Sequence, residues 1–299
     1  MSQQATKQSQ KIAIIAAEIG WGSGFESAER GSELLLQAGL GERLQAKVAR
    51  IKSEPSMANG PLDGEELEMA IMNHASRVSD AVLDAVQKGM FPVVIGGDHT
   101  SALGFHTGLA RAFGETGIVW VDTHPDLNTP ETSPSGNIHG MPLAHILGYG
   151  DSELSGIGGF QGKVDPSHVA LVGVRDIDPQ ERGLMKESGI HVFTMRDIDE
   201  RGMAEVGQEV LSVIDAGTDG FHVSFDVDGL DPEVAPGSGT LVPGGVSFRE
   251  AHLLLELCAD TSNMVSMEVV ELNPILDIRN ETAERVKQLI QSAFGLSIL

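Results

Sequence analysis

Three potential metal ligands follow one short apolar segment near the middle of the chain. Residues 117–121 read Gly-Ile-Val-Trp-Val, a run typical of a buried strand. Asp122, His124 and Asp126 come next, at every second position. Because side chains alternate along a strand, this spacing predicts that all three point the same way. Burying unpaired carboxylates is unfavourable, so a cation is their expected partner.

Two further apolar segments end in residues of the same kind. Residues 221–225 precede Asp226 and Asp228, and residues 91–96 lead to His99. In parallel α/β sheets, sites form at the carboxyl ends of the strands, so these side chains are expected to converge. Convergence makes the alternative, solvated polar residues in an exposed loop, the weaker interpretation.

The six candidates are four carboxylates and two imidazoles. A catalytic zinc takes about three protein ligands, so this larger set suits two divalent ions that share bridging carboxylates. An oxygen-rich set without sulfur favours manganese, although imidazole also suits zinc, iron and nickel.

The chain is strongly acidic. It has 20 Lys and Arg against 43 Asp and Glu, a net charge of −23, which argues against nucleic acid and anionic membranes as partners. A small cationic substrate is compatible with this field, although solubility accounts for most of the charge. Cys258 has no cysteine partner and is expected to be a buried thiol. Without a recognisable signal peptide or membrane span, the expected location is cytoplasmic.

Apolar runs alternate with segments of helical periodicity, which predicts a three-layer α-β-α fold around an eight-stranded, mainly parallel sheet. Strands are expected near residues 11–17, 46–51, 91–96, 117–123, 168–174, 190–194, 221–227 and 263–271. Helices are expected near 26–37, 65–88, 101–113, 141–148, 179–188, 199–216, 247–260 and 280–294. Residues 1–10 are expected to be disordered, 52–64 to form a surface loop, and 11–299 to form a single domain.

Two loops are informative in different ways. Residues 127–140 are dense in turn formers and hydrogen-bonding side chains and leave the ligand segment directly, so they are expected to overhang the site and contact a substrate. Gly96 and Gly97, before the Asp98-His99 pair, are expected to serve a tight turn.

Taken together, these motifs resemble the ureohydrolase family. Residues 96–99 (Gly-Gly-Asp-His), 122–126 (Asp-Thr-His-Pro-Asp) and 224–232 (Ser-Phe-Asp-Val-Asp-Gly-Leu-Asp-Pro) look like its three metal signatures. Residues 135–142 (Ser-Gly-Asn-Ile-His-Gly-Met-Pro) are similar to the arginases in particular, and 271–274 (Glu-Leu-Asn-Pro) to the acidic motif near the end of the family. The resemblance runs from the first strand to the last helix.

The resemblance implies hydrolysis of L-arginine to L-ornithine and urea at two Mn²⁺ ions per chain. It implies that His99 and Asp126 hold one manganese, that His124 and Asp228 hold the other, and that Asp122 and Asp226 bridge both.

Catalytic and substrate contacts follow from the same resemblance. His139 would shuttle protons, Glu271 would face the guanidinium, and Asp126 would orient the nucleophile. The remaining residues would bind the substrate: Asn128, Ser135 and Asn137 at the α-carboxylate, Asp178 and Glu181 at the α-amino group, and Thr240 beside Glu271. Asp199, Arg249 and Glu250 match inter-subunit positions and imply a homotrimer or homohexamer.

The sequence departs from the family at Thr123 and Pro125, where small residues are usual. Proline fixes φ and removes an N–H, so Pro125 is expected to tilt Asp126 and alter metal affinity. The other histidines, including His106 and His222, are expected to be structural, and Asp98 and Asp231 to support the ligands or turns.

Other functions stay open at this point. The chain could be another ureohydrolase, acting on agmatine, a guanidino acid or formiminoglutamate. It could also be a non-catalytic metal-binding homologue, although the full set of six ligands argues against that.

Overall fold

The computed structural model describes residues 11–24, 27–54, 60 and 62–295. The segment expected to be disordered, residues 1–10, lies outside the described residues. So do residues 55–59 and 61 of the expected surface loop.

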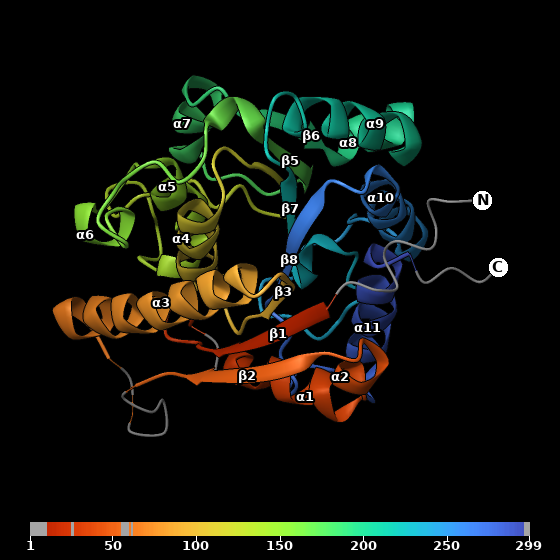
Figure 1. The fold of residues 1–299 in the computed structure, drawn as a ribbon. Helices are drawn as coiled ribbons and strands as arrows, with labels where there is room; N and C mark the ends of the chain where they lie inside the picture. The colour runs from red at the N-terminus through yellow and green to blue at the C-terminus, as the bar shows by residue number, and fades with distance from the viewer. Residues whose placement is uncertain (1–10, 25–26, 55–59, 61, 296–299) are drawn as a thin grey trace.

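Eight parallel strands form one sheet in the order β2-β1-β3-β8-β7-β4-β5-β6 (Figure 1). Every expected strand is present, and the fold class is confirmed. The strands are β1 (Lys11–Glu18), β2 (Lys47–Lys52), β3 (Met90–Ile95), β4 (Gly117–Val121), β5 (Val169–Val174), β6 (His191–Thr194), β7 (Phe221–Asp226) and β8 (Met264–Val270).

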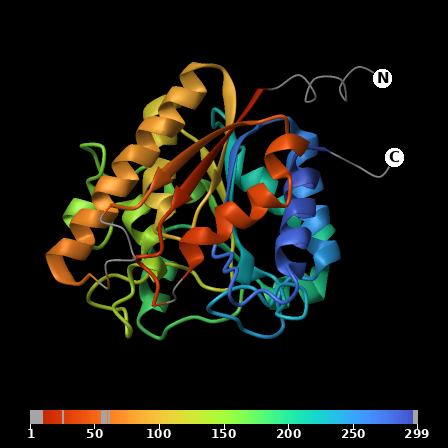
Figure 2. The same ribbon diagram turned by 90° about the horizontal axis from the view of Figure 1, so that it is seen from below.

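Helices cover both faces of the sheet, and in Figure 2 α3 and α11 lie on opposite sides of it. One layer holds α1 (Gly31–Gln37), α2 (Leu40–Arg43), α8 (Met195–Arg201), α9 (Met203–Ile214), α10 (Phe248–Thr261) and α11 (Glu281–Ala293). The other holds α3 (Gly64–Gln87), α4 (Ser101–Ala112), α5 (Pro142–Leu147), α6 (Ser152–Ser155) and α7 (Glu181–Glu187).

Strand β4 shows how one sequence serves both layers. Val119 and Val121 pack into the core beneath α9 and α10, whereas Ile118 and Trp120 pack into the core beneath α4 and α5. All five residues of the strand are buried. An apolar run without polar alternation is therefore what a central parallel strand requires.

The helix expected over 199–216 is wrong in its bounds. Two helices occupy the region, because Thr194 and Asp197 form a capping box that starts α8 at Met195. Gly202, with φ of 80°, then separates α8 from α9. The short helices α2 and α6 were not expected either. None of the helices in the described part of the chain is both long and apolar enough to cross a membrane.

Gly97 makes a close backbone contact just beyond β3. The amide of Asp98 donates to the Ile19 carbonyl at 3.0 Å. A Cβ on Gly97 would lie 1.6 Å from that same oxygen and 2.8 Å from the Cα of Glu29. Space, rather than a tight turn alone, requires glycine here, and the contact fixes the loop that carries His99.

Replacing Gly97 with alanine should therefore destabilise the fold. Overpacking of a rigid contact costs about 1–3 kcal/mol, and backbone on both sides leaves little room to relax. Gly183→Ala is the matched control, because its Cβ would meet nothing within 4 Å in α7. Thermal unfolding should show a lower midpoint for Gly97→Ala only; equal midpoints would contradict the packing argument.

Candidate metal centre and active site

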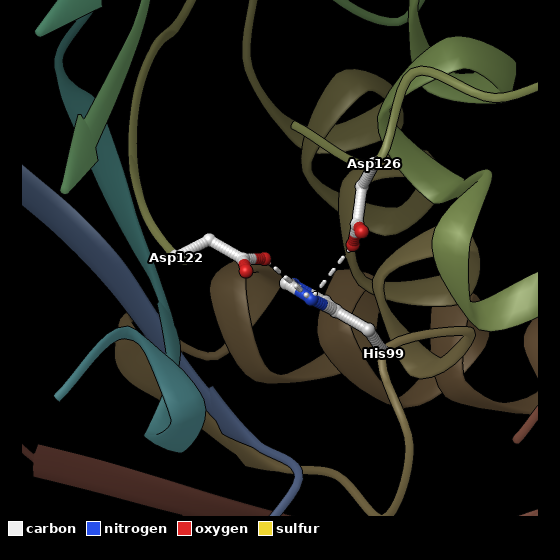
Figure 3. A group of neighbouring side chains, drawn as sticks. All are labelled: His99, Asp122 and Asp126. Atoms are coloured by element: carbon white, nitrogen blue, oxygen red, sulfur yellow. Dashed lines mark ion pairs between the residues drawn. The ribbon is translucent and has the colours of Figure 1, made fainter. Parts of the chain in front are cut away.

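Three of the expected ligands meet around a ring nitrogen of a fourth, His99. The Nδ1 atom of His99 lies 3.3 Å from Asp122 Oδ2, 3.0 Å from Asp126 Oδ2 and 3.1 Å from Asp226 Oδ2. Figure 3 shows His99 between Asp122 and Asp126, with its ring nitrogen directed at both carboxylates. All four side chains are buried. Their ligand atoms thus face a common point.

A second cluster lies beside the first. His124 Nδ1 lies 3.6 Å from Asp122 Oδ1 and 3.2 Å from Asp228 Oδ2. Asp122 belongs to both clusters and offers a different oxygen to each imidazole. Two ligand groups that share one carboxylate are the arrangement expected for a pair of neighbouring cations.

The local geometry differs from the expected one. Strand β4 ends at Val121, so strand alternation does not align the three side chains that follow. A turn does this instead: the amide of His124 donates to Asp122 Oδ1 at 2.7 Å, and Asp126 takes a left-handed φ of 53°. The expected convergence is present, but its stated cause was wrong.

A matching turn follows β7. Asp226 is the last residue of the strand, and Asp228 lies on a short 3-10 helix, η6 (Val227–Gly229). The amide of Asp228 donates to Asp226 Oδ1 at 2.7 Å, the same contact that His124 makes with Asp122. An aspartate that binds the amide two residues later thus orients both ligand pairs.

Unsatisfied polar atoms indicate that the clusters fit a cation. His99 Nδ1 and Asp126 Oδ2 are buried and form no hydrogen bond. Burial, with the nearby Asp122 carboxylate, raises the pKa of Asp126 to about 7. Burial and the Asp228 and Asp122 carboxylates raise the pKa of Asp226 well above its ordinary value. Divalent ions would offset this crowding of negative charge.

The same carboxylates favour the charged form of the two imidazoles. Burial disfavours a charged His124, but Asp122 and Asp228 outweigh it and raise its pKa to about 12. Burial likewise opposes charge on His99, yet Asp122, Asp126 and Asp226 raise its pKa well above its ordinary value. Both rings therefore lie where positive charge is strongly favoured.

Residues around the ligands hold them in place. Trp120 Nε1 donates to Asp122 Oδ2 at 3.0 Å, and its ring stacks on His99 with centroids 4.3 Å apart. Thr123 Oγ1 donates to the Asp228 carbonyl at 2.7 Å, so it joins the two ligand loops. Asp98 Oδ2 accepts from the amides of Gly22 and Ser23, as expected of a supporting residue.

Arg175 was missed by sequence reasoning. Its guanidinium donates to the carbonyls of Asp228, Gly229 and Leu230, and so braces the loop that carries a ligand. The only available signal was its position directly after β5, since carbonyl acceptors leave no trace in side-chain patterns.

A cavity of about 270 Å³ opens over the clusters. Most expected site residues line it: His124, Asp126, Asn128, Ser135, Asn137, His139, Asp178, Glu181, Asp226, Asp228 and Thr240. Ser133 and Gly140, from the loop expected to overhang the site, also line it, as does Asp176, which was not expected. His99, Asp122 and Glu271 are buried and lie outside this lining.

His139 and Glu271 contact each other. The Nδ1 atom of His139 lies 2.9 Å from Glu271 Oε1, which also accepts from the His99 amide at 3.0 Å. Burial opposes charge on His139, but the Glu271 carboxylate raises its pKa to about 9. The two side chains were expected to act separately, and the structure pairs them.

Glu181 and Asn128 hold the loop that leaves the metal cluster. Glu181 is buried and accepts from the amides of Leu127 at 2.7 Å and Asp178 at 3.3 Å. Burial raises the pKa of Glu181 to about 8, against the effect of these amides. Asn128 Nδ2 donates to Asp178 Oδ2 at 2.9 Å.

Other expected residues have different surroundings. Thr240 donates to Asp228 Oδ2 at 2.6 Å, so it contacts a metal-ligand candidate. Ser135 is exposed at the rim, and its hydroxyl accepts from the amide of Asn137 at 3.2 Å. Asp199 and Arg249 are exposed, whereas Glu250 caps α10 by accepting from the amide of Ser247.

Comparison with known proteins identifies the family. The model of the arginase family matches residues 10–295. The chain belongs to the arginase family. An arginase of Bacillus caldovelox is 41% identical over 297 residues, and the match covers 96% of this chain and 99% of that protein.

Solved structures of family members share the fold. The crystal structure of arginase from Bacillus subtilis has a TM-score of 0.90 and 38% identity, and the match covers 97% of this chain and 100% of that one. Arginase of Entamoeba histolytica, solved in complex with L-ornithine, has a TM-score of 0.88 and 30% identity, over 96% and 98% of the two chains.

Metal content tests the shared carboxylate. We expect two divalent ions per chain. Asp122→Asn should lower the affinity for these ions at least about tenfold, because removing the charge of a direct ligand should cost more than removing a residue that only supports a ligand. Asp176→Asn is the matched control, since it removes a cavity carboxylate outside both clusters. Elemental analysis after gel filtration measures the content. One ion per chain in fully active protein would exclude the paired site.

Proposed function

We propose that this protein is an arginase that hydrolyses L-arginine to L-ornithine and urea with two Mn²⁺ ions per chain. The observation that carries the proposal is the pair of His/Asp clusters that share Asp122 beneath an acid-lined cavity. Membership of the arginase family supports it. The oxygen-rich ligand set favours manganese.

The six ligands would divide between two ions. His99 and Asp126 would hold one ion and His124 and Asp228 the other, while Asp122 and Asp226 would bridge them. When bound, divalent ions of this kind supply activated water for hydrolysis at neutral pH. Asp126 can orient the attacking water by accepting a hydrogen bond from it.

The cavity suits a molecule with cationic groups at both ends. Asp176 and Asp178 line the cavity and would attract an α-ammonium group, while Glu181 would hold Asp178 in place through the Asp178 amide. Asn128, Asn137 and Ser135 offer hydrogen-bond donors to an α-carboxylate.

At the inner end, Glu271 lies behind His139, which lines the cavity, and its carboxylate could bind the planar guanidinium with two parallel hydrogen bonds if His139 moves aside. That contact would hold the reacting carbon close to the nucleophile. Because His139 contacts Glu271 Oε1, the guanidinium must share or replace this contact when it binds.

His139 is suited to donate the proton that the leaving amine requires. Its pKa of about 9 keeps the imidazole protonated at neutral pH. It also lines the cavity, so it can reach both substrate and solvent. A histidine held protonated in this position can act as a general acid.

The assembly and location are also proposals. Asp199 and Arg249 are exposed and available to a second copy. With Glu250, they would form the interface of a homotrimer or homohexamer. The cytoplasmic location stays a prediction.

Removal of the imidazole tests the proton donor. His139→Ala should retain both ions but turn over about 10²- to 10⁴-fold more slowly, the usual contribution of a general acid. His191→Ala, an exposed histidine at the start of β6, is the control and should keep the wild-type rate. A wild-type pH–rate profile for His139→Ala would show that His139 does not transfer the proton.

Substrate choice separates arginase from an agmatine-hydrolysing relative. Agmatine lacks the α-carboxylate, so Asn128, Ser135 and Asn137 would have no hydrogen-bond partner on this substrate. We therefore expect L-arginine to exceed agmatine in kcat/KM by roughly 10²-fold or more, measured as urea released with added Mn²⁺. Agmatine as the better substrate would refute the arginase assignment and favour another ureohydrolase.

The role of the Asn128 and Asn137 side chains in substrate recognition can be tested separately from the hydrolytic reaction. An Asn128→Ala, Asn137→Ala double variant should mainly reduce the arginine-to-agmatine ratio, because neither residue belongs to a metal cluster. Its activity on agmatine and its metal content serve as internal controls. An unchanged ratio would leave arginase standing and remove these two residues from substrate recognition.

A further inference from the structure

A buried hydrogen-bonded chain supports His99 on the side away from the ligand carboxylates. His99 Nε2 lies 3.0 Å from Ser224 Oγ, which in turn donates to Glu268 Oε1 at 2.8 Å. Ser224 on β7 and Glu268 on β8 are register partners in neighbouring strands, so their side chains share one face of the sheet. All three side chains have an exposed fraction of 1% or less.

Core packing does not explain why a glutamate occupies position 268. A carboxylate inside a sheet is unfavourable unless it is paired. Among the described residues, no lysine or arginine pairs with it, and its Oε2 makes no hydrogen bond.

The nearest imidazole does not provide the missing charge. His106 Nε2 lies 3.4 Å from Glu268 Oε1. Burial lowers the pKa of His106 to about 3, so this ring is neutral at neutral pH. The contact of Glu268 with Ser224 is therefore the one that accounts for an acid at this position.

The order of donors and acceptors links this contact to His99. A neutral imidazole has one N–H and one lone pair. If Nδ1 binds a metal ion, Nε2 must carry the proton and donate it to Ser224 Oγ. The Ser224 hydroxyl must then direct its own proton elsewhere, and Glu268 Oε1 is the acceptor within reach.

Stacking alone does not specify this state. Trp120 lies parallel to the His99 ring, with an interplanar angle of 11°, and so fixes the plane of the ring. The same plane is kept if the ring turns over and exchanges its two edges. That turn would exchange Nδ1 with Cδ2 and Nε2 with Cε1, so the contact of Nε2 with Ser224 fixes the ring orientation on the side away from the carboxylates.

We propose that Glu268 is a positioning residue that acts through Ser224 to hold the His99 proton on Nε2 and leave the Nδ1 lone pair free to bind a metal ion among the ligand carboxylates. The inference rests on the proposed metal site. It assigns Glu268 a role in metal affinity rather than in substrate binding, since its carboxylate is fully buried and is linked through Ser224 to the ring of His99.

The test measures Mn²⁺ affinity, by competition with a chelator, and the number of ions bound per chain. Ser224→Ala and Glu268→Met each break the chain and should weaken binding of one ion by about 10- to 100-fold. Glu268→Gln should lose less, because its amide oxygen can still accept from Ser224. Ser224→Ala combined with Glu268→Met should bind no more weakly than the weaker single variant, since the chain is already broken.

Ser266→Ala is the matched control. Ser266 is a fully buried serine on β8, two residues from Glu268, and its hydroxyl has no hydrogen-bond partner in the structure. It should bind both ions as the wild type does. Thermal unfolding of each metal-free variant shows whether it folds. If Glu268→Met does not fold, Glu268→Gln and Ser224→Ala provide the test.

Wild-type affinity in folded Ser224→Ala or in folded Glu268→Met would overturn the inference, as would additive losses in the double variant. A loss in Ser266→Ala as large as in Ser224→Ala would also overturn it. These outcomes leave the proposed function intact if the wild type binds two ions. A wild-type protein that binds no Mn²⁺ would instead overturn the proposed function.

Discussion

Repulsion between buried carboxylates is the constraint on which the rest of the structure depends. Asp122, Asp126 and Asp226 lie within 3.3 Å of His99 Nδ1, and Asp228 lies 3.2 Å from His124 Nδ1. Such a group is stable only if the surrounding structure prevents the side chains from moving apart. The tight contact at Gly97 and the turns after β4 and β7 all restrict that movement. Under the proposed function, the rigidity of the sheet edge would thus help to hold the metal ligands in place.

The parallel sheet explains why distant segments can meet this demand together. Strands β3, β4 and β7 all end at the same edge, and β8 lies between β3 and β7. This order places Glu268 beside Ser224, and Ser224 beside His99, although the three residues are far apart in sequence. Topology therefore supplies an outer support for one ligand without any local motif.

Sequence patterns could predict the strands and the ligand types, because apolar runs and polar residues at strand ends have direct physical causes. They could not predict the left-handed φ of Asp126, since backbone conformation after the strand depends on how the loop packs. The contact between His139 and Glu271 joins residues 132 positions apart. Arg175 binds carbonyl groups, which carry no side-chain signal. Glu268 reads simply as part of a strand until its neighbours are known.

The pairing of His139 with Glu271 changes how substrate entry is understood. Glu271, the carboxylate proposed to bind a guanidinium, already faces the imidazole of His139, whose pKa is about 9. Under the proposed function, binding is then an ion exchange: one positive group replaces another at the same oxygen, and the local charge is nearly conserved. The departing imidazolium is released at the moment when the reaction needs a mobile proton donor. Substrate binding at Glu271 would thus also free His139 to donate its proton.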